Sequence, residues 1–182
     1  MSASGPAELW ALGFLTAVED EEHGVFGGYL VLNALGRPLE FHCTTPIKPS
    51  RAQRILYGPT LGPYLYGEQI GQTLVKKAGL EPQVLCTDVP AMLATRPLVT
   101  GPMALVRAAG DVAGVRVDSP HHSPPAPRSF ELHGHRLTVA ANYPGDEAIV
   151  AQRLSLLGEH FDLTEPFGRI REAIEEARRS GG

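Results

Sequence analysis

The 182-residue sequence lacks the features that mark several large classes of protein. Its formal net charge is only −4, from 16 Lys and Arg against 20 Asp and Glu, so no overall charge favours nucleic acid or an anionic membrane. No apolar run approaches the roughly 18 to 20 residues of a membrane span. The first ten residues lack the basic stretch and cleavage site of a secretory signal. We therefore expect a soluble, cytoplasmic protein with no membrane partner and no nucleic-acid partner.

Cysteine and cofactor motifs are scarce as well. The two cysteines, Cys43 and Cys86, belong to no C-x-x-C pair, whereas a structural zinc site takes four ligands. The phosphate-binding patterns G-x-x-x-x-G-K-[ST] and G-x-G-x-x-G are missing. Contents of 43% hydrophobic and 20% charged residues exclude a wholly disordered chain. These absences leave a globular protein for which we expect no cofactor and no bound metal.

Glycine and proline, by contrast, are abundant. The chain holds 20 glycines and 16 prolines, above the average of roughly 7% and 5%. They gather between apolar stretches, which predicts many short elements with rigid joints. The Pro/His-rich stretch at about 118–128 is interpreted as an internal loop of a single domain over 1–182, because the roughly 60 residues after it could not bury a large core alone.

Hydrophobic patterning predicts an α+β fold. Two apolar stretches of strand length flank an acidic turn, and Asn33-Ala34-Leu35-Gly36 is typical of a hairpin turn whose fourth residue reaches positive φ. The chain therefore begins with an antiparallel meander. Further strands follow the first helices, so we expect a mixed sheet with helices packed on one face. The predicted strands are 9–18, 25–32, 39–44, 83–86, a hairpin within 103–117 and another within 130–141.

Two helices are predicted in the middle of the chain. Ser50 is a good N-cap for a short helix over 51–57. Pro63 opens a longer helix that runs to Ala78 and ends at Gly79.

Two more helices are predicted at the end of the chain, capped by Asp146 and Thr164. The last one has an apolar stripe, and we expect i,i+4 ion pairs on its polar side between Arg171 and Glu175 and between Glu175 and Arg179.

The segment 46–69 is the best candidate for a binding surface. It concentrates tyrosine, glycine and proline, and it carries a basic patch on an otherwise acidic chain. The backbone N–H groups of a helix N-terminus after Thr60 could receive a phosphate or carboxylate. The alternative is a rigid connector in which Gly67 and Gly71 let a helix lie close to the sheet. The candidate binding residues are Lys48, Arg51, Arg54, Tyr57, Thr60, Tyr64, Tyr66 and Glu68.

The two cysteines offer a second candidate site. Each follows a predicted strand, and if these strands are parallel neighbours, both thiols lie at the carboxyl edge of a sheet, where open α/β sheets place ligands. The alternative is that both are small buried residues. The candidate thiol edge comprises Cys43, Thr44, Cys86, Thr87 and Asp88.

Four histidines between residues 121 and 135 form no metal-ligating pattern, because the predicted turn at Gly134 separates His133 from His135.

Two functions remain open from the sequence. The first is a non-catalytic binding or scaffold domain that acts through 46–69, with another protein or its own copy as partner and a small anionic ligand also possible. Single-stranded nucleic-acid binding is set aside, because three basic residues are few against a net charge of −4. The second is a small enzyme or metal/thiol protein with its site at the thiol edge.

Overall fold

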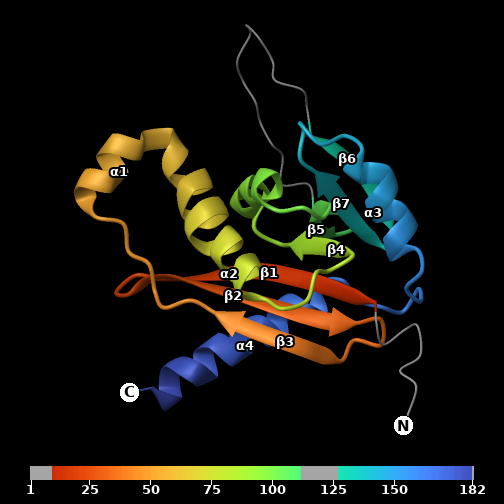
Figure 1. The fold of residues 1–182 in the computed structure, drawn as a ribbon, viewed down its shortest axis with the longest axis horizontal. Coiled ribbons are helices and arrows are strands. Elements are labelled where there is room, and N and C mark those ends of the chain that lie inside the picture. The colour runs from red at the N-terminus through yellow and green to blue at the C-terminus, as the bar shows by residue number, and fades with distance from the viewer. Residues whose placement is uncertain (1–9, 112–126, 182) are drawn as a thin grey trace, which may run out of the picture.

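The computed structural model describes residues 10–111 and 127–181 (Figure 1). Its strands are β1 (Ala11–Asp20), β2 (Gly24–Asn33), β3 (Pro38–Cys43), β4 (Val84–Thr87), β5 (Met103–Ala108), β6 (Arg128–Leu132) and β7 (His135–Val139). Its α-helices are α1 (Arg51–Tyr57), α2 (Thr73–Lys77), α3 (Asp146–Leu154) and α4 (Glu165–Ser180). Further helical segments are η1 (Gly58–Thr60), the π-helical η2 (Pro63–Gln72) and the 3-10 segment η3 (Pro90–Leu98).

These strands form one mixed sheet in the order β3-β2-β1-β4-β5-β7-β6. The first three make the antiparallel meander predicted from the sequence, and β6 and β7 make the predicted hairpin. Between these hairpins β4 pairs in parallel with β1, and β5 pairs in parallel with β4. The α+β class, the meander, the mixed sheet and the two C-terminal helices are confirmed.

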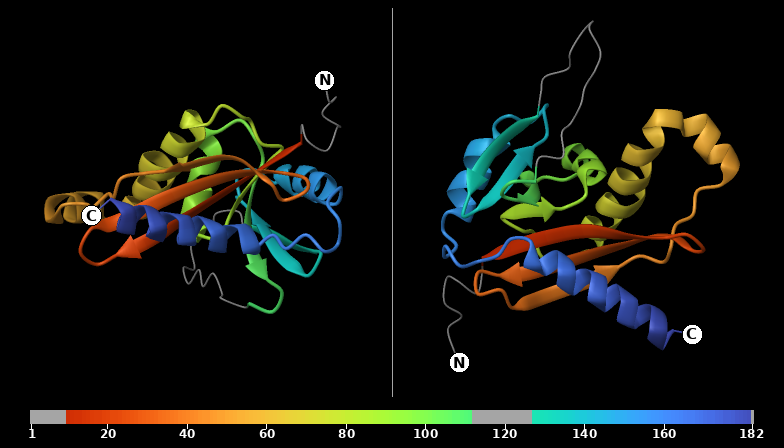
Figure 2. Two further views of the ribbon diagram at one scale, coloured as in Figure 1. Left: turned by 90° about the horizontal axis from the view of Figure 1, so that it is seen from below. Right: turned by 180° about the vertical axis from the view of Figure 1, so that it is seen from behind.

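Helices cover both faces of the sheet, so the prediction of helices on one face is wrong (Figure 2). On one face η2, α2 and η3 pack through residues such as Ile70 and Met92. On the other face α3 and α4 pack through residues such as Val150, Phe167 and Ile170. The burial of β4 reflects this double cover, since every one of its residues is buried. A strand covered on both faces is apolar throughout, whereas a strand with one exposed face alternates apolar and polar residues.

Two consecutive glycines let helices approach both faces of β2. A Cβ placed on Gly27 would lie 2.2 Å from Cγ2 of Ile70 in η2, and a Cβ on Gly28 would lie 2.2 Å from Cγ2 of Ile170 in α4. Because successive strand residues point to opposite faces, the pair opens one gap on each side. The glycines therefore fix how closely both helical layers pack.

A buried ion pair ties the segment after β4 to the start of α3. Asp146 accepts from Nε of Arg96 at 2.5 Å, from Nη2 of Arg96 at 3.0 Å and from the backbone N–H of Met103 at 3.2 Å. The Arg96 guanidinium also lies 4.1 Å from the centre of the Tyr143 ring. Asp146 was expected to cap α3. The N-cap is Gly145 instead, because the carboxylate is committed to Arg96.

The remaining expectations concern loops and location. Residues 112–117 of one predicted hairpin and most of the 118–128 loop lie outside the described residues. The single domain and the cytoplasmic location stay predictions. No helix within the described ranges has the length and apolar character needed to cross a membrane.

Candidate functional site

The carboxyl ends of β1 and β4 bring together three polar residues from distant parts of the chain. Thr16 lies in β1, Asp88 directly follows β4, and Arg171 is on α4. Thr16 Oγ1 donates a hydrogen bond to Asp88 Oδ1 at 2.6 Å. Arg171 Nη2 donates to Thr16 Oγ1 at 3.1 Å and also to Asp88 Oδ2. Ligand crevices in open α/β sheets lie at the carboxyl ends of parallel strands, so this Thr16–Asp88–Arg171 cluster marks a candidate site.

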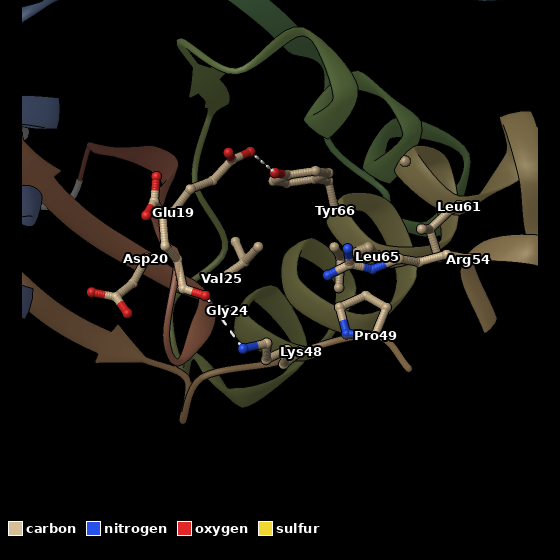
Figure 3. Close-up of a pocket in the computed structure, with 12 residues that line it drawn as sticks. Glu19, Asp20, Gly24, Val25, Lys48, Pro49, Arg54, Leu61, Leu65 and Tyr66 are labelled. Carbon is tan, nitrogen blue, oxygen red and sulfur yellow. Dashed lines mark hydrogen bonds between the residues drawn. The ribbon is translucent and has the colours of Figure 1, made fainter. Parts of the chain in front are cut away.

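A cavity of about 540 Å³ lies at the same end of the sheet, beside the β1–β2 turn (Figure 3). Its lining includes acidic residues from the end of β1, Lys48 from the segment before α1 and Arg54 from α1 itself. Tyr66 donates a hydrogen bond to Glu19 across the upper edge of the cavity. Burial is the larger cause, and this bond the second, of a raised pKa of Tyr66. Lys48 Nζ donates to the carbonyl oxygen of Glu22 at 2.7 Å.

The negative charge of Asp20, also on the cavity wall, is compensated by neighbouring hydrogen-bond donors. Its carboxylate accepts from the backbone N–H of His23 at 2.8 Å, from the His23 ring at 2.9 Å and from Arg178 Nη2 at 2.5 Å. These contacts, with the His23 backbone bond the largest, hold the pKa of Asp20 far below its ordinary value. The acidic wall of the cavity therefore carries less free charge than its composition indicates.

The short helix α1 projects from the body of the protein (Figure 1). It begins as predicted at Ser50, whose hydroxyl accepts from Gln53 N while the Gln53 side chain accepts from Ser50 N. No residue of α1 is buried, and Ile55 and Leu56 are 69% and 83% exposed. A helix that serves only its own core would bury an apolar stripe. Its exposed apolar residues therefore suit contact with another molecule.

Two arginines of α1 are exposed as well. Arg51 and Arg54 form no ion pair with any residue in the described part of the chain, unlike Arg171 and Arg178. Just beyond α1, the rings of Tyr57 and Tyr64 stack with their centroids 4.3 Å apart.

The predicted binding residues are thus only partly brought together. Lys48, Arg54 and Tyr66 line the cavity. Thr60 instead closes the turn after α1 by donating to the carbonyl oxygen of Tyr57 at 2.7 Å, and Glu68 is exposed on η2. Their role in binding stays a prediction.

The two helix glycines of this segment have a different role from the one expected. A Cβ on Gly67 would lie 2.9 Å from Cβ of Ala94, and one on Gly71 would lie 2.0 Å from Oγ1 of Thr95. The glycines therefore let η2 pack against η3, not against the sheet.

The structure does not bring the two cysteines of the thiol edge together. Cys43 ends β3 and Cys86 lies in β4, and both β2 and β1 separate these strands. Cys43 is exposed, whereas Cys86 is fully buried and its burial raises the pKa of the thiol to about 12. The hydroxyls of Thr44 and Thr87 accept from backbone N–H groups of Gly27 and Val89. Of this set only Asp88 belongs to the Thr16–Asp88–Arg171 cluster.

The two cysteines should consequently react very differently with a thiol reagent. In the native protein we expect Ellman's reagent to modify one thiol quickly, and the second only after unfolding, because a thiolate is the reactive form and Cys86 has neither access nor an accessible thiolate. The Cys43→Ser variant should show no fast reaction. Equal rates for both thiols in the native protein would contradict the burial of Cys86.

Sequence reasoning missed two members of the Thr16–Asp88–Arg171 cluster. The one signal in the sequence was a threonine, Thr16, within an otherwise apolar strand, and the structure shows this residue fully buried. Arg171 was expected to pair with Glu175, but it pairs with Asp88 instead. The predicted pair between Glu175 and Arg179 is confirmed, and Glu175 also pairs with Arg178.

The histidines show no metal site among the described residues. His121 and His122 lie outside them, and His135 pairs with Asp162 at 3.1 Å. Within residues 10–111 and 127–181 no group of three or more His, Cys, Asp or Glu could hold a metal ion.

Comparisons with known proteins give a likeness in structure alone. No family model matches the chain, and no curated protein matches it either. Human Endonuclease V matches with a TM-score of 0.51 and 15% identity, over 97% of this chain and 89% of the human chain. The chain has an Endonuclease V-like fold. The human catalytic domain gives a TM-score of 0.49 at 14% identity, over 92% of this chain and 83% of that chain. A Ciona intestinalis Endonuclease V in complex with DNA gives 0.45 at 9% identity, over 92% and 86%.

This likeness corrects the functional expectations from the sequence. The sequence predicted a non-catalytic scaffold that binds a protein or its own copy and no nucleic acid. This prediction is contradicted, because the matching fold is that of an endonuclease. The expectation of no nucleic acid rested on the net charge of −4, which averages the whole chain, whereas Arg51 and Arg54 of α1 are exposed and form no ion pair with any described residue.

Proposed function

We propose that the protein acts on nucleic acid, whose backbone lies along the end of the sheet where β1 turns into β2 and where β4 ends. The observation that carries this proposal is the likeness to an endonuclease over nearly the full length of both chains. In Figure 1, α1 and the C-terminal end of α4 lie on either side of this end of the sheet, so a strand placed there would meet both.

The chemistry of α1 supports contact with a nucleic acid. Arg51 and Arg54 are exposed and free of ion pairs within the described residues, so binding a phosphate would not require breaking an internal pair. Phosphate contacts of this kind position the backbone without reading sequence. Ile55, Leu56 and the stacked tyrosines beside them offer apolar and aromatic surface of the kind on which unpaired bases stack.

The residues at the carboxyl ends of β1 and β4 do not suit the metal that many nucleases use. Such enzymes hold divalent ions on clustered carboxylates. Here the Asp88 carboxylate already accepts from Thr16 and Arg171, and within the described residues it belongs to no group of three or more His, Cys, Asp or Glu that could hold a metal ion. We therefore derive no step through a metal ion at this position.

Charge reversal on α1 tests the proposed function. The Arg51→Glu/Arg54→Glu variant should bind a fluorescein-labelled 20-mer oligonucleotide at least roughly tenfold more weakly. The slope of log affinity against log salt concentration should be smaller in magnitude by about 1 to 2, because fewer counterions are released when fewer phosphates are contacted. The measurement is fluorescence anisotropy with single-stranded and duplex DNA and RNA between 50 and 200 mM salt (the range in which such slopes are about −0.7 to −0.9 per contact).

A matched control separates this site from general charge effects. Arg128→Glu/Arg136→Glu makes the same change in net charge on the β6–β7 hairpin, where both arginines pair with glutamates. The control should bind like the wild type. Failure of the wild type to bind any of the four probes, or equal losses in both double variants, would refute the proposal.

A further inference from the structure

Arg171 uses its guanidinium differently from Arg169 and Arg178 of the same helix, whereas the fourth arginine of α4, Arg179, is 71% exposed and pairs with Glu175. Arg169 commits Nε, Nη1 and Nη2 to Glu165 and to the carbonyl oxygen of Gly36, and Arg178 commits Nη1 to Glu175 and Nη2 to Asp20. Arg171 makes both of its bonds, to Thr16 and Asp88, through Nη2 alone. Toward the described residues, its Nε–H and Nη1–H groups make no hydrogen bond, and the side chain is 44% exposed.

The position of this guanidinium is fixed from two sides. Its own helix is held on the sheet by Phe167, Ile170 and Ile174, which are at most 2% exposed. Its tip is held by Asp88, which is itself oriented by the hydroxyl of the fully buried Thr16. An arginine fixed in this way loses little side-chain entropy when it binds an anion, and planar guanidinium donors match the geometry of phosphate oxygens.

The charges of the cluster also favour an anion on the outer side of Arg171. Alone, the Asp88 carboxylate would repel a phosphodiester. Arg171 neutralises it, and its unused donors extend beyond the pair at the carboxyl ends of β1 and β4.

We propose that Arg171 is a phosphate-binding residue that contacts the nucleic-acid backbone through Nε–H and Nη1–H, while Asp88 and Thr16 position it. This inference rests on the proposed function and names how one phosphate of that substrate is held. The guanidinium supplies the positive charge beside Asp88, so the contact does not depend on a divalent ion.

The test measures oligonucleotide affinity in EDTA with variants of the cluster. Arg171→Gln should weaken binding of the labelled 20-mer roughly tenfold, about the loss of one strong charged contact. Arg171→Lys keeps the charge without the planar fork and should recover only part of the loss. If Arg171→Gln fails to fold by circular dichroism, Arg171→Lys still gives the comparison, because a lysine retains the pair with Asp88. Arg169→Gln on the same helix is the matched control and should bind within twofold of the wild type.

The Asp88→Asn variant distinguishes a role of Asp88 in positioning Arg171 from an effect of its negative charge on oligonucleotide binding. Removal of a negative charge near a phosphate should strengthen binding if only the net charge matters. If Asp88 positions Arg171, the Asp88→Asn variant should instead bind the oligonucleotide about threefold to tenfold more weakly. Thr16→Val, which changes no charge, should also weaken oligonucleotide binding. We expect weakening in both variants, with unfolding midpoints reported for each.

The outcomes distinguish the two proposals. Wild-type protein that binds no oligonucleotide overturns the proposed function and this inference together. Wild-type binding that is unchanged in Arg171→Gln, or that tightens in Asp88→Asn, overturns this inference only. Binding that is lost in EDTA and restored by Mn²⁺ in the wild type, but not in Asp88→Asn, also overturns it, because the cation beside Asp88 would then be the metal.

Discussion

Replacing Asp146 with alanine is expected to lower the free energy of unfolding by about 3–5 kcal/mol, the cost of removing one partner from a buried ion pair. The side chains of Arg96 and Asp146 are 12% and 5% exposed. The substitution leaves the Arg96 charge without its carboxylate in a poorly hydrated place, and it leaves the backbone N–H of Met103 without its acceptor. Urea unfolding followed by circular dichroism gives the measurement.

Removing both partners provides the control. In Arg96→Met/Asp146→Leu no unpaired charge remains, and apolar side chains of similar size can fill the space, so most of the loss should be recovered. The double variant should therefore be more stable than Asp146→Ala alone. A loss below about 1 kcal/mol in Asp146→Ala would mean that the pair is hydrated and behaves as an exposed one.

The elements that could be predicted are those set by local chemistry. Asn33 closes the β2–β3 turn as its type and position indicate, with its side-chain oxygen accepting from the N–H groups of Leu35 and Arg37. Ser50 begins α1 through a reciprocal bond with Gln53. In each case the donor and acceptor groups lie within four residues of one another, so the local sequence is enough to predict the hydrogen bond.

The candidate site was hidden because its residues meet only through the fold. Asp88 lies 72 residues from Thr16, and Arg171 lies 83 residues from Asp88. Their meeting depends on β4 joining the sheet beside β1, whereas the sequence left open whether β4 lies beside β3. The local similarity of Cys43 and Cys86 misled for the same reason: a shared position at the end of a strand says nothing about which strands are adjacent.

The close approach of α4 to β2 depends on a residue that the sequence analysis passed over. Gly28 faces α4, where a Cβ would lie 2.2 Å from Cγ2 of Ile170 and 3.0 Å from Cδ1 of Ile174. Both isoleucines are buried and cannot move away without displacing the helix. Since Arg171 directly follows Ile170, the space above Gly28 also sets the distance from Arg171 to Asp88.

Gly28→Ala is therefore expected to destabilise the protein by about 3 kcal/mol, at the upper end of what overpacking a core costs. Gly168→Ala, on α4 itself, meets no atom within 4 Å and should stabilise by roughly 0.5–1 kcal/mol through helix propensity. The same substitution would then change stability in opposite directions at Gly28, under the helix, and at Gly168, on the exposed side of that helix. In the double variant Gly28→Ala/Ile170→Ala the loss should be smaller than the sum of the two single losses, because the smaller side chain makes room for the new methyl group. Additive losses in this cycle, measured by urea unfolding, would show that the contact between Gly28 and Ile170 does not limit how closely α4 approaches the sheet.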